Sequence, residues 1–465
     1  MWLVLAIVVC FVLGCLIVEP AWSGSKTEIE VLFYLCLVVC FGIGAFSVVF
    51  LIARALSVAH IFKADLIAIT LLATLRLVGR RRRRVNLDRA RASDFDLPRQ
   101  LQTFLVAAFA VSICIATYAL LARVIAHPHG DGWDAFAIWN LHARFLFLGG
   151  SHWRDGFSNL IPWSHPDYPP LLPAAVAHFW IYLDNDSSAV PATLGMLFTI
   201  GTTAFLYASL AINRGHNAAI LGTLALLSTP FFIEQGAAQY ADIPLSFFFL
   251  ATLVLLNQGW KSNSRRLLIL SGLAAGFAAW TKNEGLLFLL SAVIGQALTS
   301  LLDAHSAGPG SLRRMTAFCA GTAPMLALIL WYKHLTPPVD LFASPASMIA
   351  KVTTILRYWS VLQWFGKEVL RFGDWWIIPL TLVLLAVYFF SDHQQAGAPE
   401  ASRRASIWTL GISLAGYFVI YVITPNELYW HLRFSLNRLF LALWPAALFL
   451  FFSSVSLRSP AKVSK

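Results

Sequence analysis

The chain has 465 residues, of which 58% are hydrophobic and only 12% are charged, and its mean hydropathy is +0.70. A soluble domain needs more charged surface than this, so the composition excludes a soluble protein and indicates a polytopic membrane protein. The formal net charge of +11 comes from short basic blocks between apolar runs. Such blocks set membrane orientation and argue against nucleic-acid binding.

Apolar runs long enough, or nearly long enough, to cross about 30 Å of hydrocarbon occur at about twelve places. They begin near residues 2, 30, 101, 189, 216, 243, 265, 285, 314, 375, 405 and 435. The first run, 2–18, has no basic segment before it and no small-residue cleavage site, so we expect a retained membrane helix. The run 62–78 would place five arginines outside if it crossed, so we expect it to be interfacial or re-entrant.

The connecting segments alternate between basic and acid-rich character. The basic ones are 80–91, 213–216, 261–266, 313–314, 403–404 and the tail with Lys462 and Lys465, and the positive-inside rule makes them cytoplasmic, with both termini. The acid-rich ones then face outward. The sequence predicts three parts: an N-terminal hairpin with an interfacial segment and a basic loop (1–98), a catalytic membrane domain (99–455) with an outer loop (127–188), and a cytoplasmic tail (456–465).

The outer loop is too long to be a passive connector, which indicates a function. Within it Trp133, Phe136, Asn140, Arg144 and Phe147 recur at steps of three or four residues. That spacing predicts an amphipathic helix on the membrane surface. The following apolar stretch, 169–183, is expected to pack at the interface without crossing.

Four segments carry a family resemblance. They are Trp133-Asp134 with a closing Ala143-Arg144, then His165-Pro-Asp-Tyr-Pro-Pro-Leu-Leu-Pro173, then Tyr240-Ala-Asp242-Ile-Pro, then Trp280-Thr-Lys282-Asn-Glu284-Gly. Together and in this order they resemble the GT-C integral-membrane glycosyltransferases, most closely the bacterial branch related to protein O-mannosyltransferases and aminoarabinose transferases, over roughly residues 100–450.

The resemblance implies an all-α bundle of about twelve transmembrane helices in the bacterial inner membrane, each long enough to cross the hydrocarbon. It also implies an inverting transfer of a sugar from a polyprenyl-phosphate donor to a lipid, glycan or protein acceptor at the periplasmic or outer face. Two alternatives stay open: a transporter or lipid flippase, and an enzyme like an O-antigen ligase or polymerase. The sugar and the acceptor are not specified by the sequence.

The resemblance places a catalytic carboxylate at the start of the first outer loop. Asp134 fits this place best and Asp131 is the second choice, because an acceptor hydroxyl must lose a proton as it attacks the anomeric carbon. Asp242, before Pro244, matches a second functional acid of the family. The alternative for Asp134 and for Asp242 is a helix N-cap.

Cations are needed to hold the phosphate while the glycosidic bond breaks. The candidates for substrate or phosphate binding are Lys282, Arg433, Arg438, His431, Tyr168, His165 and Arg144. Related enzymes can carry a lysine where this chain has His165 and Asp167, so the phosphate role is expected to shift to Lys282 or the C-terminal arginines. The alternative is that these cations pair with acids such as Glu284 and Glu427, or with lipid headgroups.

No cofactor is expected, because no phosphate-binding glycine loop is present and a lipid-phosphate donor carries its own leaving group. The histidines of the outer loop, His142, His152, His165 and His178, have no recognised metal-ligand spacing, and a divalent metal is kept only as an alternative. The six cysteines lie within apolar runs and lack paired spacing, so we expect them to be buried hydrophobic side chains.

Overall fold

The computed structural model describes residues 2–22, 27–78, 97–302, 310–338, 341, 345–374, 380–390 and 400–455. Every regular element in this part of the chain is helical, which confirms the predicted all-α membrane fold. The arginines of 80–84 and the C-terminal lysines lie outside the described residues.

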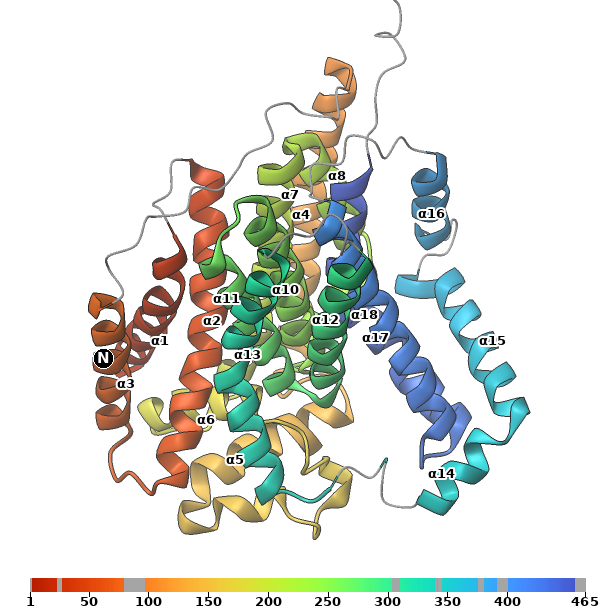
Figure 1. The fold of residues 1–465 in the computed structure, drawn as a ribbon. Coiled ribbons are helices and arrows are strands. Elements are labelled where there is room, and N and C mark those ends of the chain that lie inside the picture. Colours follow the sequence, from red (N-terminus) through yellow and green to blue (C-terminus); the bar gives the residue numbers. More distant parts are fainter. Residues whose placement is uncertain are drawn as a thin grey trace, which may run out of the picture.

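Most of the described helices form one bundle (Figure 1). They are α1 (Trp2–Val18), α2 (Glu28–Ala55), α4 (Arg99–Ala126), α7 (Ala189–Arg214), α8 (His216–Leu227), α9 (Pro230–Ala237), α10 (Asp242–Lys261), α11 (Arg265–Thr281), α12 (Asn283–Leu302), α13 (Gly310–Leu335), α17 (Glu400–Ile423) and α18 (Leu428–Ser454). The other helices are α3 (Ile61–Val78), α5 (Asn140–Leu148), α6 (Leu171–Leu183), α14 (Pro345–Val352), α15 (Ile355–Arg371) and α16 (Leu380–Phe390). Short turns are η1 (Glu19–Ala21), η3 (Ala135–Trp139), η4 (Gly150–Phe157), η5 (Pro162–Ser164) and η7 (Phe372–Asp374).

Nine of the described helices are long and apolar enough to cross a membrane, or ten if α8 and α9, bent by 68°, count as one broken span. The predicted run from residue 265 is α11. Its 17 residues measure about 25 Å, which is somewhat less than the hydrocarbon thickness of about 30 Å. The predicted run from residue 375 is described only as the 11-residue α16. The number of crossings therefore depends mainly on these two helices and on the bent pair.

The helix at the core of the bundle is α10, and 94% of its apolar stretch is buried. It packs against α11 and α18, and α11 in turn packs closely on α13. Close packing of α11 and α13 requires glycine at two positions. A Cβ on Gly272 would lie 2.0 Å from the carbonyl oxygen of Phe318, and a Cβ on Gly321 would lie 2.0 Å from that of Ile269. Small residues at helix contacts are the usual way in which membrane helices approach closely.

The predicted interfacial segment 62–78 is α3, which stands beside α1 and α2 in Figure 1. It is fixed to the bundle by a buried polar contact. Asp65 Oδ2 accepts hydrogen bonds from Tyr182 Oη at 2.6 Å and from His178 Nε2 at 3.2 Å, and both partners belong to α6. The interfacial placement itself stays a prediction, but α3 is attached to the body of the protein through its one buried carboxylate.

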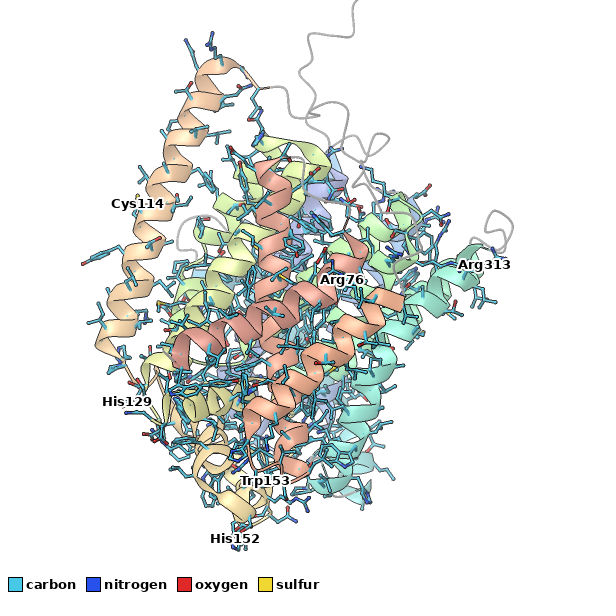
Figure 2. The ribbon with its side chains drawn as sticks, turned by 90° about the vertical axis from the view of Figure 1, so that its left-hand side faces the viewer. Arg76, Cys114, His129, His152, Trp153 and Arg313 are labelled. Atoms are coloured by element: carbon cyan, nitrogen blue, oxygen red, sulfur yellow. The ribbon has the colours of Figure 1, made fainter. Side chains whose placement is uncertain are left out.

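The outer loop folds over one end of the bundle, at the bottom in Figures 1 and 2, where His129, His152 and Trp153 lie. The predicted amphipathic helix is present but begins with a π-helical turn, Ala135–Trp139, before α5. A π turn holds more residues than an α turn, so it rotates the following side chains. Trp133, before the turn, and Phe136 are exposed, whereas Asn140, which follows the turn, is buried. The next apolar stretch is α6, whose 13 residues are too short to cross, as predicted.

Candidate functional site

The centre of the site is Arg438, which joins two of the predicted acids. Its Nη1 donates to Asp134 Oδ2 at 2.6 Å, and its Nη2 and Nε donate to Asp242 Oδ2 at 2.7 and 2.9 Å. Asp134 comes from the outer loop, Asp242 is the first residue of α10, and Arg438 lies in α18. The two acids that we expected to act together therefore share one guanidinium.

A second cation extends this arrangement. Lys282 Nζ lies 3.1 Å from Asp242 Oδ1 and 3.0 Å from Glu284 Oε1. The pKa of Lys282 would fall through burial alone, but the carboxylates of Asp242 and Glu284 outweigh burial and raise it. Lys282 is therefore charged. We call the five residues Asp134, Arg438, Asp242, Lys282 and Glu284 the ion-pair network.

The helix ends explain why these side chains meet. Lys282 is the single residue between α11 and α12, and its backbone is extended, with φ −163° and ψ 159°, so the chain leaves one helix and enters the next at this position. A Cβ on Gly285 would lie 1.9 Å from the carbonyl oxygen of Ala278, so only glycine lets α12 start this close to α11. Asp242 begins α10 and precedes Pro244, which is tolerated in a first helical turn. Both acidic and basic groups are thus fixed by helix termini.

Each of the two cations also lies over a tyrosine ring. Arg438 Cζ is 4.6 Å from the ring centre of Tyr240, and Lys282 Nζ is 5.8 Å from that of Tyr168. Burial raises the pKa of Tyr240 to about 12 and that of Tyr168 well above 10, and nearby carboxylates, including Asp134, add to both shifts. Both phenols therefore stay protonated and can donate hydrogen bonds.

Exposure distinguishes the acids of the network. The Asp134 side chain is 24% exposed, whereas that of Asp242 is 1% exposed. Asp242 accepts three hydrogen bonds from cations, two from Arg438 and one from Lys282. Asp242 is thus positioned to hold the two cations, and Asp134 is the more exposed of these two carboxylates.

The His165-Pro-Asp-Tyr segment contributes a neighbouring polar cluster. Asp167 Oδ2 accepts a hydrogen bond from Asn283 at 2.6 Å, and Lys333 Nζ donates to the Asp167 carbonyl at 2.6 Å and to Asn283 Oδ1 at 2.7 Å. Because Asn283 follows Lys282, this cluster ties the outer loop to the ion-pair network. His165 stacks on Tyr168, with ring centres 4.7 Å apart. This segment therefore positions Tyr168 beneath Lys282.

His431 borders the network. Its Nδ1 is hydrogen-bonded to Thr424 Oγ1 at 2.8 Å, and it lies within electrostatic range of Glu284, Lys282 and His165. Of the candidates for substrate and phosphate binding, Lys282, Arg438, Tyr168, His165 and His431 are thus gathered in one region.

Three other candidates lie elsewhere. Asp131 pairs with Arg123 at 3.4 Å, and Arg123 also pairs with Glu234 at 2.9 Å. Arg144 pairs with Asp186 at 3.2 Å on the surface of the outer loop. Arg433 is exposed, and its guanidinium carbon lies 5.6 Å from the ring centre of Phe434. None of the three contacts the ion-pair network.

Five contributors were not among the predicted site residues, namely Glu284, Asp167, Asn283, Lys333 and Tyr240. Lys333 lies at the end of α13, and Tyr240 lies just before α10. Lys333 could have been predicted from the sequence, because a lysine is unusual in an acid-rich segment that is expected to face outward. Tyr240 begins one of the four segments of the family resemblance, but an aromatic residue at a helix end is common in membrane proteins and did not by itself indicate a site residue.

Among the described residues, no group of three or more His, Cys, Asp or Glu side chains could hold a metal ion. The acids that come closest to such a group are those of the ion-pair network, and each of them contacts a cation of this chain.

Comparison with known proteins agrees with this architecture. Residues 165–334 match the family model of dolichyl-phosphate-mannose-protein mannosyltransferases. The matched segment contains Asp242, Lys282 and Glu284 but neither Asp134 nor Arg438. No curated protein and no solved structure matches the chain. The family match over residues 165–334 and the helical membrane fold together support a membrane glycosyltransferase of the GT-C type.

Proposed function

We propose that the enzyme transfers a sugar from a polyprenyl-phosphate-linked donor to an acceptor hydroxyl on the outer face of the bacterial inner membrane. The observation that carries the proposal is the bridge from Arg438 to Asp134 and Asp242. This bridge brings the Asp134 carboxylate close to the cations Arg438 and Lys282. A carboxylate can deprotonate an acceptor, and cations can stabilise a phosphate leaving group.

The proposed reaction is a single displacement. A lone pair of the acceptor oxygen attacks the anomeric carbon, and the bond from this carbon to the phosphate oxygen breaks with its electrons on the phosphate. Asp134 takes the acceptor proton on Oδ1, the carboxylate oxygen that does not face Arg438. Attack opposite to the leaving phosphate inverts the anomeric centre.

Arg438 and Lys282 are proposed to bind the donor phosphate. A planar guanidinium can contact a phosphate through two parallel hydrogen bonds, and Lys282 adds a point charge. Asp242 keeps both cations in place while the phosphate gains charge. Glu284 Oε2 is buried and has no hydrogen-bond partner among the described residues, so it is available to accept a hydrogen bond from a sugar hydroxyl.

The test is transfer of labelled sugar from a polyprenyl-phospho-sugar to a membrane extract by the purified full chain. Asp134→Asn is expected to lower the rate by about 10²- to 10⁴-fold, the contribution of a general base. Asp131→Asn is the matched control, because Asp131 belongs to the Arg123 cluster, and it should retain most activity. Unchanged transfer by folded Asp134→Asn protein would remove the base assignment. A divalent-metal requirement is tested in the same assay by adding a chelator.

A further inference from the structure

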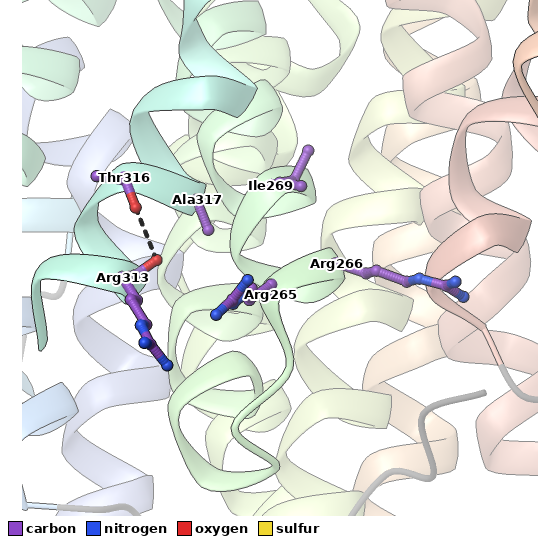
Figure 3. Close-up of a pocket in the computed structure, with 6 residues that line it drawn as sticks. All are labelled: Arg265, Arg266, Ile269, Arg313, Thr316 and Ala317. Atoms are coloured by element: carbon purple, nitrogen blue, oxygen red, sulfur yellow. Dashed lines mark hydrogen bonds between the residues drawn. The ribbon is translucent and has the colours of Figure 1, made fainter. Parts of the chain in front are cut away.

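A second positively charged site lies between α11 and α13. An open cavity of ≈ 310 Å³ lies there, lined by Arg265, Arg266, Ile269, Arg313, Thr316 and Ala317 (Figure 3). It lies at the N-terminal ends of these helices, whereas the ion-pair network lies at the C-terminal end of α11. The proposed transfer reaction uses none of these residues.

Two of these arginines have no ion-pair partner among the described residues. Arg265 and Arg313 are exposed, neither forms an ion pair with a described residue, and both side chains turn towards the space between the helices in Figure 3. Arg266 points the other way and donates to the carbonyl oxygen of Pro20 at 2.6 Å. Arg314, next in the chain, adds positive charge nearby and lies 4.6 Å from the ring centre of Trp260. Guanidinium groups collected in this way repel one another unless an anion lies between them.

Close packing of α11 against α13 holds the backbone that carries these arginines. One to two turns further along, Gly272 and Gly321 let the backbones of α11 and α13 touch, as described above. Ser264 caps the start of α11 by accepting a hydrogen bond from the Leu267 amide at 3.4 Å. The small side chain of Ala317 leaves the cavity open beneath the arginines. The separation of Arg265 from Arg313 is therefore set by helix packing.

We propose that this cavity binds the phosphate group of an anionic phospholipid. Guanidinium groups match phosphate oxygens in geometry as well as charge. A water molecule occupies about 30 Å³, so the cavity has room for a phosphate and several waters. A lipid is favoured over a free anion because Ile269, 41% exposed, and Leu312, 63% exposed, give acyl chains an apolar surface beside the arginines. Basic cavities between membrane helices are a known type of lipid-headgroup site.

The experiment measures anionic lipid bound to the purified full chain. The protein is delipidated, then mixed with micelles containing phosphatidylglycerol or phosphatidylcholine, and bound lipid is quantified by mass spectrometry. The wild type should retain phosphatidylglycerol in preference to phosphatidylcholine. Arg313→Gln and Arg265→Gln should each lower the affinity about fivefold, which corresponds to about 1 kcal/mol per arginine near a membrane surface.

The matched control is Arg99→Gln, which removes an exposed arginine from the start of α4. Equal retention of phosphatidylglycerol by Arg313→Gln and Arg99→Gln would overturn the proposal. If either glutamine variant fails to fold, Arg313→Lys keeps the charge and loses the planar fork, and an intermediate affinity is expected. Inorganic phosphate is the other arm of the test. Competition by millimolar phosphate, with no preference between the two lipids, would overturn the lipid assignment in favour of a free anion.

Discussion

Arg438 donates to Asp134 Oδ2 at 2.6 Å and to Asp242 Oδ2 at 2.7 Å from the two terminal nitrogens of one guanidinium. These nitrogens are held a fixed distance apart in a plane, so the two carboxylates are held in a fixed relation as well. A lysine ammonium offers one point charge and cannot reproduce this geometry.

The first prediction concerns Arg438→Lys. We expect the transfer rate to fall about 10²- to 10³-fold, the usual effect of losing one charge-stabilising donor. The rate of sugar transfer with the polyprenyl-phosphate donor is the measurement. Arg433→Lys serves as the control, because Arg433 is exposed on another face of α18. Similar losses in both variants would mean that Arg438 has no special role.

The second prediction concerns stability. Asp242 is 1% exposed, and Arg438→Ala leaves its buried charge with Lys282 as the one remaining cation. Removal of one partner of a buried ion pair costs about 3–5 kcal/mol. Thermal unfolding in detergent should show this loss.

The double variant Arg438→Ala/Asp242→Asn supplies the internal control. It removes the buried charge that has lost its guanidinium partner and should recover much of the stability without recovering activity. An unfolding temperature as low as that of Arg438→Ala would count against the buried-charge explanation.

The third prediction is a pH dependence that arises from His142. Burial, with a smaller contribution from the charge of His165, lowers the pKa of His142 to about 3, while an unfolded histidine titrates near 6.5. As the pH falls below about 6.5 the unfolded chain takes up a proton that the folded chain does not accept until about pH 3. The stability is therefore complete above pH 6.5 and decreases on acidification, by at most about 1.4 kcal/mol per pH unit.

The measurement compares unfolding temperatures at pH 7.5 and pH 5.0 for the wild type, His142→Gln and His152→Gln. His142→Gln should show a smaller difference between the two pH values than the wild type. His152 is 81% exposed in its side chain, so His152→Gln should behave like the wild type. Identical pH dependence in all three proteins would exclude His142 as the source.

The fourth prediction tests the contact between α11 and α13. A Cβ on Gly272 would lie 2.0 Å from the carbonyl oxygen of Phe318, so Gly272→Ala must separate the two helices. Overpacking of this kind costs about 1–3 kcal/mol. Gly411→Ala is the matched control, since a Cβ there meets no atom within 4 Å and the replacement should be neutral or slightly stabilising. Equal unfolding temperatures for the two variants would contradict the predicted close contact.

Much of the fold follows from hydropathy alone. The apolar runs and the short α6 were predicted because each depends on a local property, namely length and composition. The π turn at Ala135–Trp139 was not predicted, since no residue type specifies it. Asn140, which the helical spacing placed with exposed Trp133, follows the turn and is buried.

For the candidate site too, the sequence indicated features that depend on local motifs but not those that depend on helix packing. Asp242 and Lys282 were singled out because each lies in a segment of the family resemblance, and the structure places both at helix boundaries; their roles stay predictions. Arg433 and Arg438 were not distinguishable, because both belong to one apolar helix and its rotation is decided by packing against α10 and α17. Of the two candidate bases, Asp134 contacts Arg438 whereas Asp131 contacts Arg123, and which of them acts as the base stays a prediction.

The order in which the ribosome makes the chain gives the ion-pair network a further property. Lys282 follows Asp242 by 40 residues, whereas Arg438 follows Asp242 by 196 residues and Asp134 by 304 residues. At about 5–20 residues per second, Lys282 arrives roughly 2 to 8 s after Asp242, and Arg438 arrives roughly 15 to 60 s after Asp134. During insertion into the membrane, Asp242 can therefore pair early with Lys282. Asp134 can pair with Arg438 only after α18 has been made. Chains that stop before α18 contain most of the helices but lack the arginine that assembles the site.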